Sequence, residues 1–144
     1  MYKKRLAKFQ FKSRSKNLRQ MRCSVRNVLQ EYGYPGDAVD NIVLALCEAC
    51  SNVIQHAYGE ECSKEIVLEI FHDEQRLMFR LRDFATPIDM DCIKSRKLDD
   101  LRPGGLGVHF IYQIMDEVAY ARCSEGKGNV LEMIKQIVPT REAG

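Results

Sequence analysis

A carboxylate and an amide lie one helical turn apart near the middle of the chain. Asn52 follows Glu48 by four positions, and His56 follows Asn52 by four more. Residues with this spacing lie on one line of an α-helix, which here also includes the small Ala45. A carboxylate can act as a general base, and an amide oxygen suits magnesium beside substrate phosphates. The pattern predicts one wall of a pocket, and the alternative is a solvent-exposed Glu–Asn pair.

A second carboxylate ends an apolar strand pattern. In residues 76–83 the side chains of Leu77, Phe79 and Leu81 face one way, and Asp83 continues their line. An acid on the inward face of a strand should lie at the edge of the core, where it needs a hydrogen-bond donor. The exocyclic amine of adenine is one such donor. The alternative is a structural Asp that accepts bonds from its own turn.

The third feature is a glycine-rich segment that opens a predicted helix. Its residues are Arg102, Pro103, Gly104, Gly105, Leu106, Gly107 and Val108. Glycines let the backbone approach a ligand, and the free N–H groups at a helix start favour phosphate. The segment lacks the Lys-Ser or Lys-Thr of a Walker A loop, and no βαβ unit surrounds it. An ordinary loop before a helix is the alternative.

The hydrophobic pattern predicts the elements that position these groups. We expect helices at 15–32, 37–59 and 106–115, and strands at 4–12, 65–71, 76–83, 118–122 and 130–138. The order is β-α-α-β-β-loop-α-β-β, with the strands mostly in hairpins. This order predicts an α+β, two-layer sandwich with helices on one face of a mixed, mostly antiparallel sheet.

Capping residues predict where the first two helices begin and end. Ser15 or Asn17 can cap the first helix, and Asp37 can cap the second, with Asp40 as a weak capping-box partner. Gly59 is expected to end the second helix. The segment 84–105, with a short helix at 89–97, is expected to be a functional loop.

Composition predicts one globular domain over residues 1–144, since the chain is 45% hydrophobic and 29% charged. No apolar run approaches the ~18 residues of a membrane span. The start of the chain lacks an apolar signal core, and the six scattered cysteines fit a reducing compartment. We therefore expect a cytoplasmic protein. Cys47 and Cys50 are expected to be small buried side chains and not a zinc or redox site.

Charge is distributed unevenly along the chain. Residues 1–26 contain ten Lys or Arg and no acid, while the remainder contains 12 basic and 20 acidic residues. Either this segment binds an acidic partner or it is a solvated basic face. Arg19, Arg22 and Arg26 are expected on the outer side of the first helix. Direct binding of nucleic acid is not expected, because few aromatic residues are interspersed with these charges.

Three segments together resemble the nucleotide-binding motifs of the Bergerat-fold ATPases, which include gyrase, histidine kinases and MutL. CEACSNVIQHAY at 47–58 resembles the N box, RDFATPIDM at 82–90 the first glycine box, and PGGLGVHFIYQIMDEV at 103–118 the second. The likeness extends from about residue 5 to 138 and is greatest to the bacterial anti-sigma-factor serine kinases. It implies a histidine kinase-like ATPase domain that uses ATP and Mg²⁺.

The resemblance also implies roles for individual residues. Glu48 would be the catalytic base, Asn52 would hold Mg²⁺ against the triphosphate, and Asp83 would recognise adenine. Residues 84–105 would form an ATP lid. The remaining candidates for nucleotide binding are Ala85, Arg102, Gly104, Gly105, Leu106, Gly107 and Val108.

One residue departs from the family pattern, because Ala85 stands where the first glycine box has a glycine. If that position needs a positive φ, alanine costs on the order of 1 kcal/mol and weakens ATP binding modestly. The implied function is an ATP-dependent serine/threonine protein kinase that acts as an anti-sigma factor and phosphorylates an antagonist protein. A sigma factor would be a further partner, and the protein would be a homodimer. The alternative is a non-catalytic nucleotide-binding module that sequesters a sigma factor or an antagonist.

Overall fold

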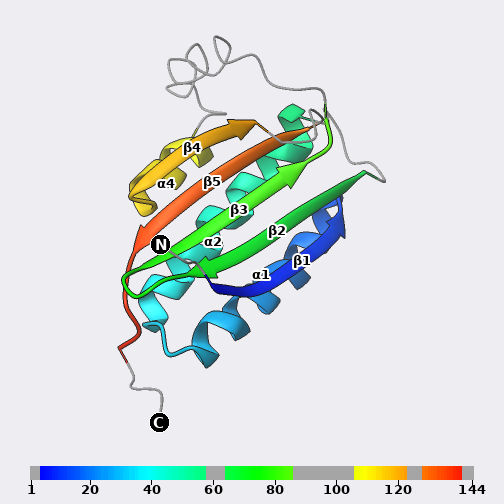
Figure 1. The fold of residues 1–144 in the computed structure, drawn as a ribbon. Helices are drawn as coiled ribbons and strands as arrows, with labels where there is room; N and C mark the ends of the chain where they lie inside the picture. The colour runs from blue at the N-terminus through cyan, green and yellow to red at the C-terminus, as the bar shows by residue number, and fades with distance from the viewer. Residues whose placement is uncertain (1–3, 58–63, 86–105, 123–127, 141–144) are drawn as a thin grey trace.

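A five-stranded sheet carries the helices on one face. The computed structural model describes residues 4–57, 64–85, 106–122 and 128–140. Its elements follow the order β1-α1-α2-η1-β2-β3-α4-β4-β5. In Figure 1 the helices lie together behind the sheet. The α+β class and the placement of the described helices on one face are therefore confirmed.

The strands form one antiparallel sheet with the spatial order β1-β2-β3-β5-β4. They are β1 (Lys4–Lys12), β2 (Glu65–His72), β3 (Arg76–Asp83), β4 (Glu117–Arg122) and β5 (Asn129–Gln136). All four pairings between these strands are antiparallel, so the expectation of a mixed sheet is wrong for the described strands. The reason is that β5, and not β4, lies beside β3 after the chain has passed through α4. The predicted strand bounds are correct to within two residues.

The alternation predicted for β3 is confirmed. Leu77, Phe79 and Leu81 are buried, and so are the side chains on the same face of β2. Phe79 is paired with Ile70, and Leu81 with Leu68. Successive side chains of a strand point to opposite faces, so this register directs one apolar row from each strand toward the helices.

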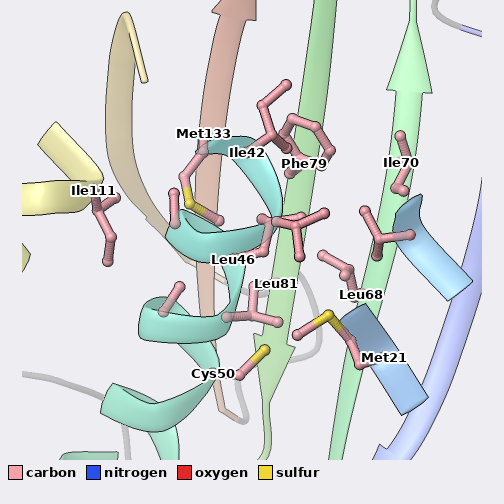
Figure 2. Close-up of a cluster of buried hydrophobic side chains, with 14 of the residues drawn as sticks. Met21, Ile42, Leu46, Cys50, Leu68, Ile70, Phe79, Leu81, Ile111 and Met133 are labelled. Atoms are coloured by element: carbon pink, nitrogen blue, oxygen red, sulfur yellow. The ribbon is translucent and has the colours of Figure 1, made fainter. Parts of the chain in front are cut away.

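The helices cover this apolar row. They are α1 (Ser15–Glu31), α2 (Gly36–Asn52) and α4 (Leu106–Ile114), and a π-helical turn, η1 (Val53–Ala57), continues α2. Both α1 and α4 pack against α2. In Figure 2, side chains from the helices meet those of the sheet in one buried cluster. The labelled members are Met21, Ile42, Leu46, Cys50, Leu68, Ile70, Phe79, Leu81, Ile111 and Met133.

The capping predictions are wrong for α1 and α2. The N-cap of α1 is Arg14, whose side chain makes no capping bond, so the helix is capped by neither Ser15 nor Asn17 as its N-cap residue. Asn17 Nδ2 instead donates to a carbonyl at the end of β1 at 2.9 Å. The N-cap of α2 is Pro35, with φ −61°, and Asp37 lies in the first turn without a capping bond. Pro35 has ψ 138°, an extended conformation, so the helix begins at the next position.

The arginines of α1 also differ from the expectation. Arg22 Nη1 donates to Cys47 Sγ at 3.3 Å, and Arg26 Nε lies 3.4 Å from Asp40 Oδ1. Two of the three arginines therefore connect α1 to α2, and only Arg19 points outward as an exposed side chain. The reason is that α1 and α2 pack side by side, which places this edge of α1 within reach of α2.

Several predictions concern residues outside the described ranges. These are the helix end at Gly59, the short helix at 89–97 and the lid beyond residue 85. In the described ranges, no helix is both long enough and apolar enough to cross a membrane.

Candidate functional site

The C-terminal turns of α2 carry the predicted acid and amide. Glu48 and Asn52 are both half-buried, so they are not the solvent-exposed pair of the alternative interpretation. Ala45, on the same line, is fully buried. Cys47 faces α1 through its contact with Arg22. Because each helical residue rotates by about 100°, Glu48 and Asn52 face away from α1 and form a polar stripe on the other flank of α2.

The polar stripe keeps its α-helical spacing only as far as Asn52. From Val53 to Ala57 the chain forms the π-helical turn η1. A π-helix takes more than four residues per turn, so the i, i+4 line predicted through His56 does not continue unchanged. Such turns are frequent at functional sites.

Asp83 is buried at the end of β3, as predicted, with 4% of its surface exposed. Its Oδ1 atom accepts two hydrogen bonds of 2.9 Å, from the backbone N–H of Ala85 and from Asn129 Nδ2. Burial raises the pKa of this carboxyl, while the bonds from Asn129 and Ala85 act in the opposite direction. The site therefore contains a desolvated carboxyl whose charged form is stabilised by the side chain of Asn129 and by the backbone N–H groups of Ala85 and Asn129.

Asp83 and the polar stripe lie at one edge of the molecule. In Figure 1 the C-terminal ends of α2 and β3 point to the same edge, where β5 begins. Cys50 of α2 and Leu81 of β3 belong to the same buried cluster (Figure 2). Glu48 and Asn52 flank Cys50 in the sequence, and Asp83 follows Leu81 by two residues. The fold thus places the C-terminal end of α2 and the end of β3 at the same edge of the molecule, although they come from distant parts of the chain.

Ala85 does not carry the backbone strain that its replacement of glycine suggested. No non-glycine residue in the described ranges, which include Ala85, has a positive φ. The side chain is buried, and its N–H donates to Asp83. The condition under which alanine would cost energy at this position is therefore not met.

Two residues of the site, Gly128 and Asn129, were not predicted from the sequence. Asn129 is the cross-strand partner of Asp83 and is 7% exposed. Gly128 has φ +82°, and a Cβ there would lie 2.0 Å from the Asp83 carbonyl oxygen. The available signal was a Gly-Asn pair immediately before a strand, but its meaning depends on the register between β5 and β3.

The start of α4 is the third predicted feature. Leu106, Gly107 and Val108 form its first turn, which contains no acidic residue, and α4 packs against α2. The other predicted contacts of this segment lie outside the described residues, namely Arg102, Gly104 and Gly105. A helix start without acids beside a helix that carries a carboxylate and an amide fits a bound triphosphate and its metal ion.

A shallow hollow elsewhere on the sheet is separate from this site. It is lined by Phe71, His72, Asp73, Arg76, Met78 and Ile134. These residues surround the β2–β3 turn, at the opposite end of β3 from Asp83. The hollow therefore contains none of the predicted site residues.

Comparison with known proteins assigns the chain to a family. The family model for the histidine kinase-like ATPase domain matches residues 11–135. The serine-protein kinase RsbW of Halalkalibacterium halodurans is 31% identical over 123 residues, which cover 80% of this chain and 73% of that protein. RsbW of Bacillus subtilis is 30% identical over 125 residues, covering 81% and 76%.

Solved structures with the same fold include a chain of the SiaB–SiaC complex from Pseudomonas aeruginosa. It matches with a TM-score of 0.63 and 14% identity, over 93% of this chain and 91% of that chain. The RsbU and RsbW domains of a Mycobacterium tuberculosis protein match with a TM-score of 0.59 and 13% identity, over 91% and 32%. The resemblance inferred from the three motifs is confirmed: the chain belongs to the histidine kinase-like ATPase domain family, among relatives that are RsbW serine-protein kinases.

Proposed function

We propose that this protein is an ATP-dependent serine/threonine protein kinase that acts as an anti-sigma factor and phosphorylates an anti-sigma-factor antagonist. The observation that carries the proposal is the half-buried Glu48–Asn52 pair on α2, in a chain 31% identical to an RsbW serine-protein kinase. ATP use follows from the ATPase domain family. Ala85, which motivated a non-catalytic module, has an unstrained backbone and supports the buried Asp83.

Glu48 is the proposed catalytic base. The acceptor hydroxyl oxygen forms a bond to the γ-phosphorus of ATP, the bond to the β–γ bridging oxygen breaks, and ADP leaves. Glu48 accepts the hydroxyl proton or holds the hydroxyl in line for attack. A positioned general base contributes about 10²- to 10⁴-fold to such a step.

Asn52 is the proposed magnesium ligand, through its amide oxygen. Mg²⁺ keeps several waters and binds through few protein groups together with substrate phosphates, which suits a single amide. When bound, the ion would offset the negative charge of the triphosphate. Arg102, Gly104 and Gly105 are proposed to contact the phosphates from a lid at 84–105. Leu106, Gly107 and Val108 are proposed to do so from the start of α4.

Asp83 is the proposed adenine-recognition residue. A charged carboxylate accepts hydrogen bonds only, so it matches the exocyclic amine of adenine and not the oxygen of a 6-oxo purine. We also propose that the chain works as one cytoplasmic domain, that it forms a homodimer, and that a sigma factor is its second partner.

Transfer of labelled phosphate from ATP to a cognate antagonist tests the proposal. Glu48→Gln should reduce transfer by about 10²-fold or more, because the amide of glutamine cannot act as a general base. ATP affinity should change little, because glutamine has nearly the same shape as glutamate. Asn52→Ala should instead weaken nucleotide binding in the presence of Mg²⁺.

The matched control is Asp40→Asn, which makes the same acid-to-amide change at an exposed position facing α1. It should retain transfer. Undiminished phosphorylation by Glu48→Gln would exclude Glu48 as the base, and failure of the unmodified protein to bind ATP would exclude the kinase itself.

A further inference from the structure

Asp83 and Asn129 form a buried side-chain pair across β3 and β5. Their Cα atoms are register partners, and both side chains lie on the face that carries the core. Asn129 Nδ2 donates to Asp83 Oδ1 at 2.9 Å, and the Ala85 N–H donates to the same oxygen at 2.9 Å. The two donors approach from different elements, one from the neighbouring strand and one from the segment that follows β3.

Two donors on one oxygen fix both the orientation and the chemistry of the carboxylate. An oxygen that accepts two N–H bonds is not the one that carries a proton, so Oδ2 is the atom whose state can change. In the charged form Oδ2 accepts hydrogen bonds, whereas in the protonated form it donates one. An acceptor matches the 6-amino group of adenine, and a donor matches a 6-oxo group.

We propose that Asn129 is a positioning residue that determines nucleotide specificity, because it holds Asp83 Oδ1 and thereby presents Oδ2 to the base as an acceptor. The inference rests on the proposed function, since it requires ATP to bind beside Asp83. Asn129 itself need not touch the base. Its contribution to specificity is made entirely through Asp83.

The burial of the pair explains why the carboxylate needs this support. Desolvation raises the pKa of Asp83, and the bonds from Asn129 and Ala85 oppose that rise. Without the Asn129 amide, the protonated form gains population, and the carboxyl keeps only the backbone N–H groups of Ala85 and Asn129 as donors. Both changes weaken discrimination against a 6-oxo purine, and neither requires any loss of folded structure.

Two nucleotides that differ at position 6 of the base provide the test. ATP carries an amine there and inosine triphosphate (ITP) carries an oxygen. Calorimetric titration with each nucleotide and Mg²⁺ gives the ratio of the two affinities for the unmodified protein and for Asn129→Leu, Asn129→Ser and Asp83→Asn. Thermal unfolding of each variant shows whether it is folded. The ratio of affinities is informative because a purely structural defect weakens the binding of both nucleotides by the same factor.

We expect the unmodified protein to prefer ATP, and Asn129→Leu to reduce that preference by about tenfold or more, since a buried polar partner is lost. Asn129→Ser keeps a donor and should restore most of the preference. In Asp83→Asn the amide oxygen should face Asn129 and Ala85, which turns its NH₂ group toward the base and reverses the preference to ITP. Adding Asn129→Leu to Asp83→Asn should shrink this reversal, because the amide is then less firmly oriented.

The outcomes separate this inference from the proposed function. If the unmodified protein binds ATP but Asn129→Leu leaves the ratio unchanged, the specificity role of Asn129 is wrong and the kinase proposal stands. If Asn129→Leu does not fold, Asp83→Asn decides the matter, and a retained preference for ATP overturns the role. If the unmodified protein does not bind ATP, both proposals fail.

Discussion

Gly128 lies directly against the backbone of Asp83. A Cβ built on this glycine would be 2.0 Å from the Asp83 carbonyl oxygen and 3.0 Å from its carbonyl carbon. The glycine has φ +82°, a conformation that other residues adopt only with strain. The turn before β5 is therefore held close to the end of β3, and this approach brings Asn129 beside the Asp83 carboxylate.

Gly128→Ala should destabilise the protein by about 1–3 kcal/mol, because alanine adds both an unfavourable φ and a backbone clash. It should also weaken ATP binding, since relief of the clash must move Asp83 or Asn129. Urea unfolding measures the first effect and calorimetry the second. Gly36→Ala is the matched control, because a Cβ there meets nothing within 4 Å. An unchanged unfolding midpoint for Gly128→Ala would contradict this account.

Asp83→Asn should stabilise the nucleotide-free protein at neutral pH. The pKa of Asp83 is raised in the folded state, so the charged carboxyl lowers stability above that raised pKa. Below the unfolded-state value of about 4, both states carry the proton and the penalty disappears. The stability difference between Asp83→Asn and the unmodified protein should therefore shrink as pH falls from 7 to below 4. Denaturant unfolding across this range measures it, and a difference that does not depend on pH would argue against a buried, charged Asp83.

Local sequence patterns predicted the framework of the site well. The alternation of Leu77, Phe79 and Leu81 predicted both β3 and the buried position of Asp83. The four-residue spacing of Glu48 and Asn52 predicted a polar stripe on α2. These predictions succeeded because strand and helix periods depend on neighbours in the sequence.

Features that depend on contacts between distant segments were not predicted. Asn129 meets Asp83 only because β5 pairs with β3 in one register, and no local pattern specifies that pairing. Arg22 was expected to face outward, but its contact with Cys47 requires the packing of α1 on α2. The π-helical turn after Asn52 interrupts a pattern that looks regular in the sequence.

The β2–β3 turn should make the protein more stable above pH 4 than below it. Hydrogen bonds from the Gln75 N–H and the Arg76 guanidinium hold the pKa of Asp73 below its usual range. A group with a lowered folded-state pKa stabilises the fold above its unfolded value, and this contribution is lost as pH falls through the folded value. Asp73→Ala should therefore lower the unfolding temperature at pH 7, with a difference that vanishes in acid. Glu74→Ala, which removes a carboxylate at an exposed position of the same turn, is the matched control and should leave the unfolding temperature at pH 7 nearly unchanged.

The cysteines of α1 and α2 should differ greatly in reactivity. Cys23 is exposed, whereas Cys50 is fully buried and burial raises the pKa of its thiol. Because the thiolate is the reactive form, iodoacetamide should modify Cys23 rapidly and Cys50 only when the core opens. Peptide mass spectrometry of the native protein gives both rates, and labelling in denaturant provides the control. Saturating ATP with Mg²⁺ should slow modification of Cys50 further, by about 100-fold at 100 times the dissociation constant, since ligand binding suppresses global opening. Modification of Cys50 at the rate of Cys23 would contradict the packing of α2 on the sheet. If ATP left the Cys50 rate unchanged, the opening of α2 would not be coupled to nucleotide binding.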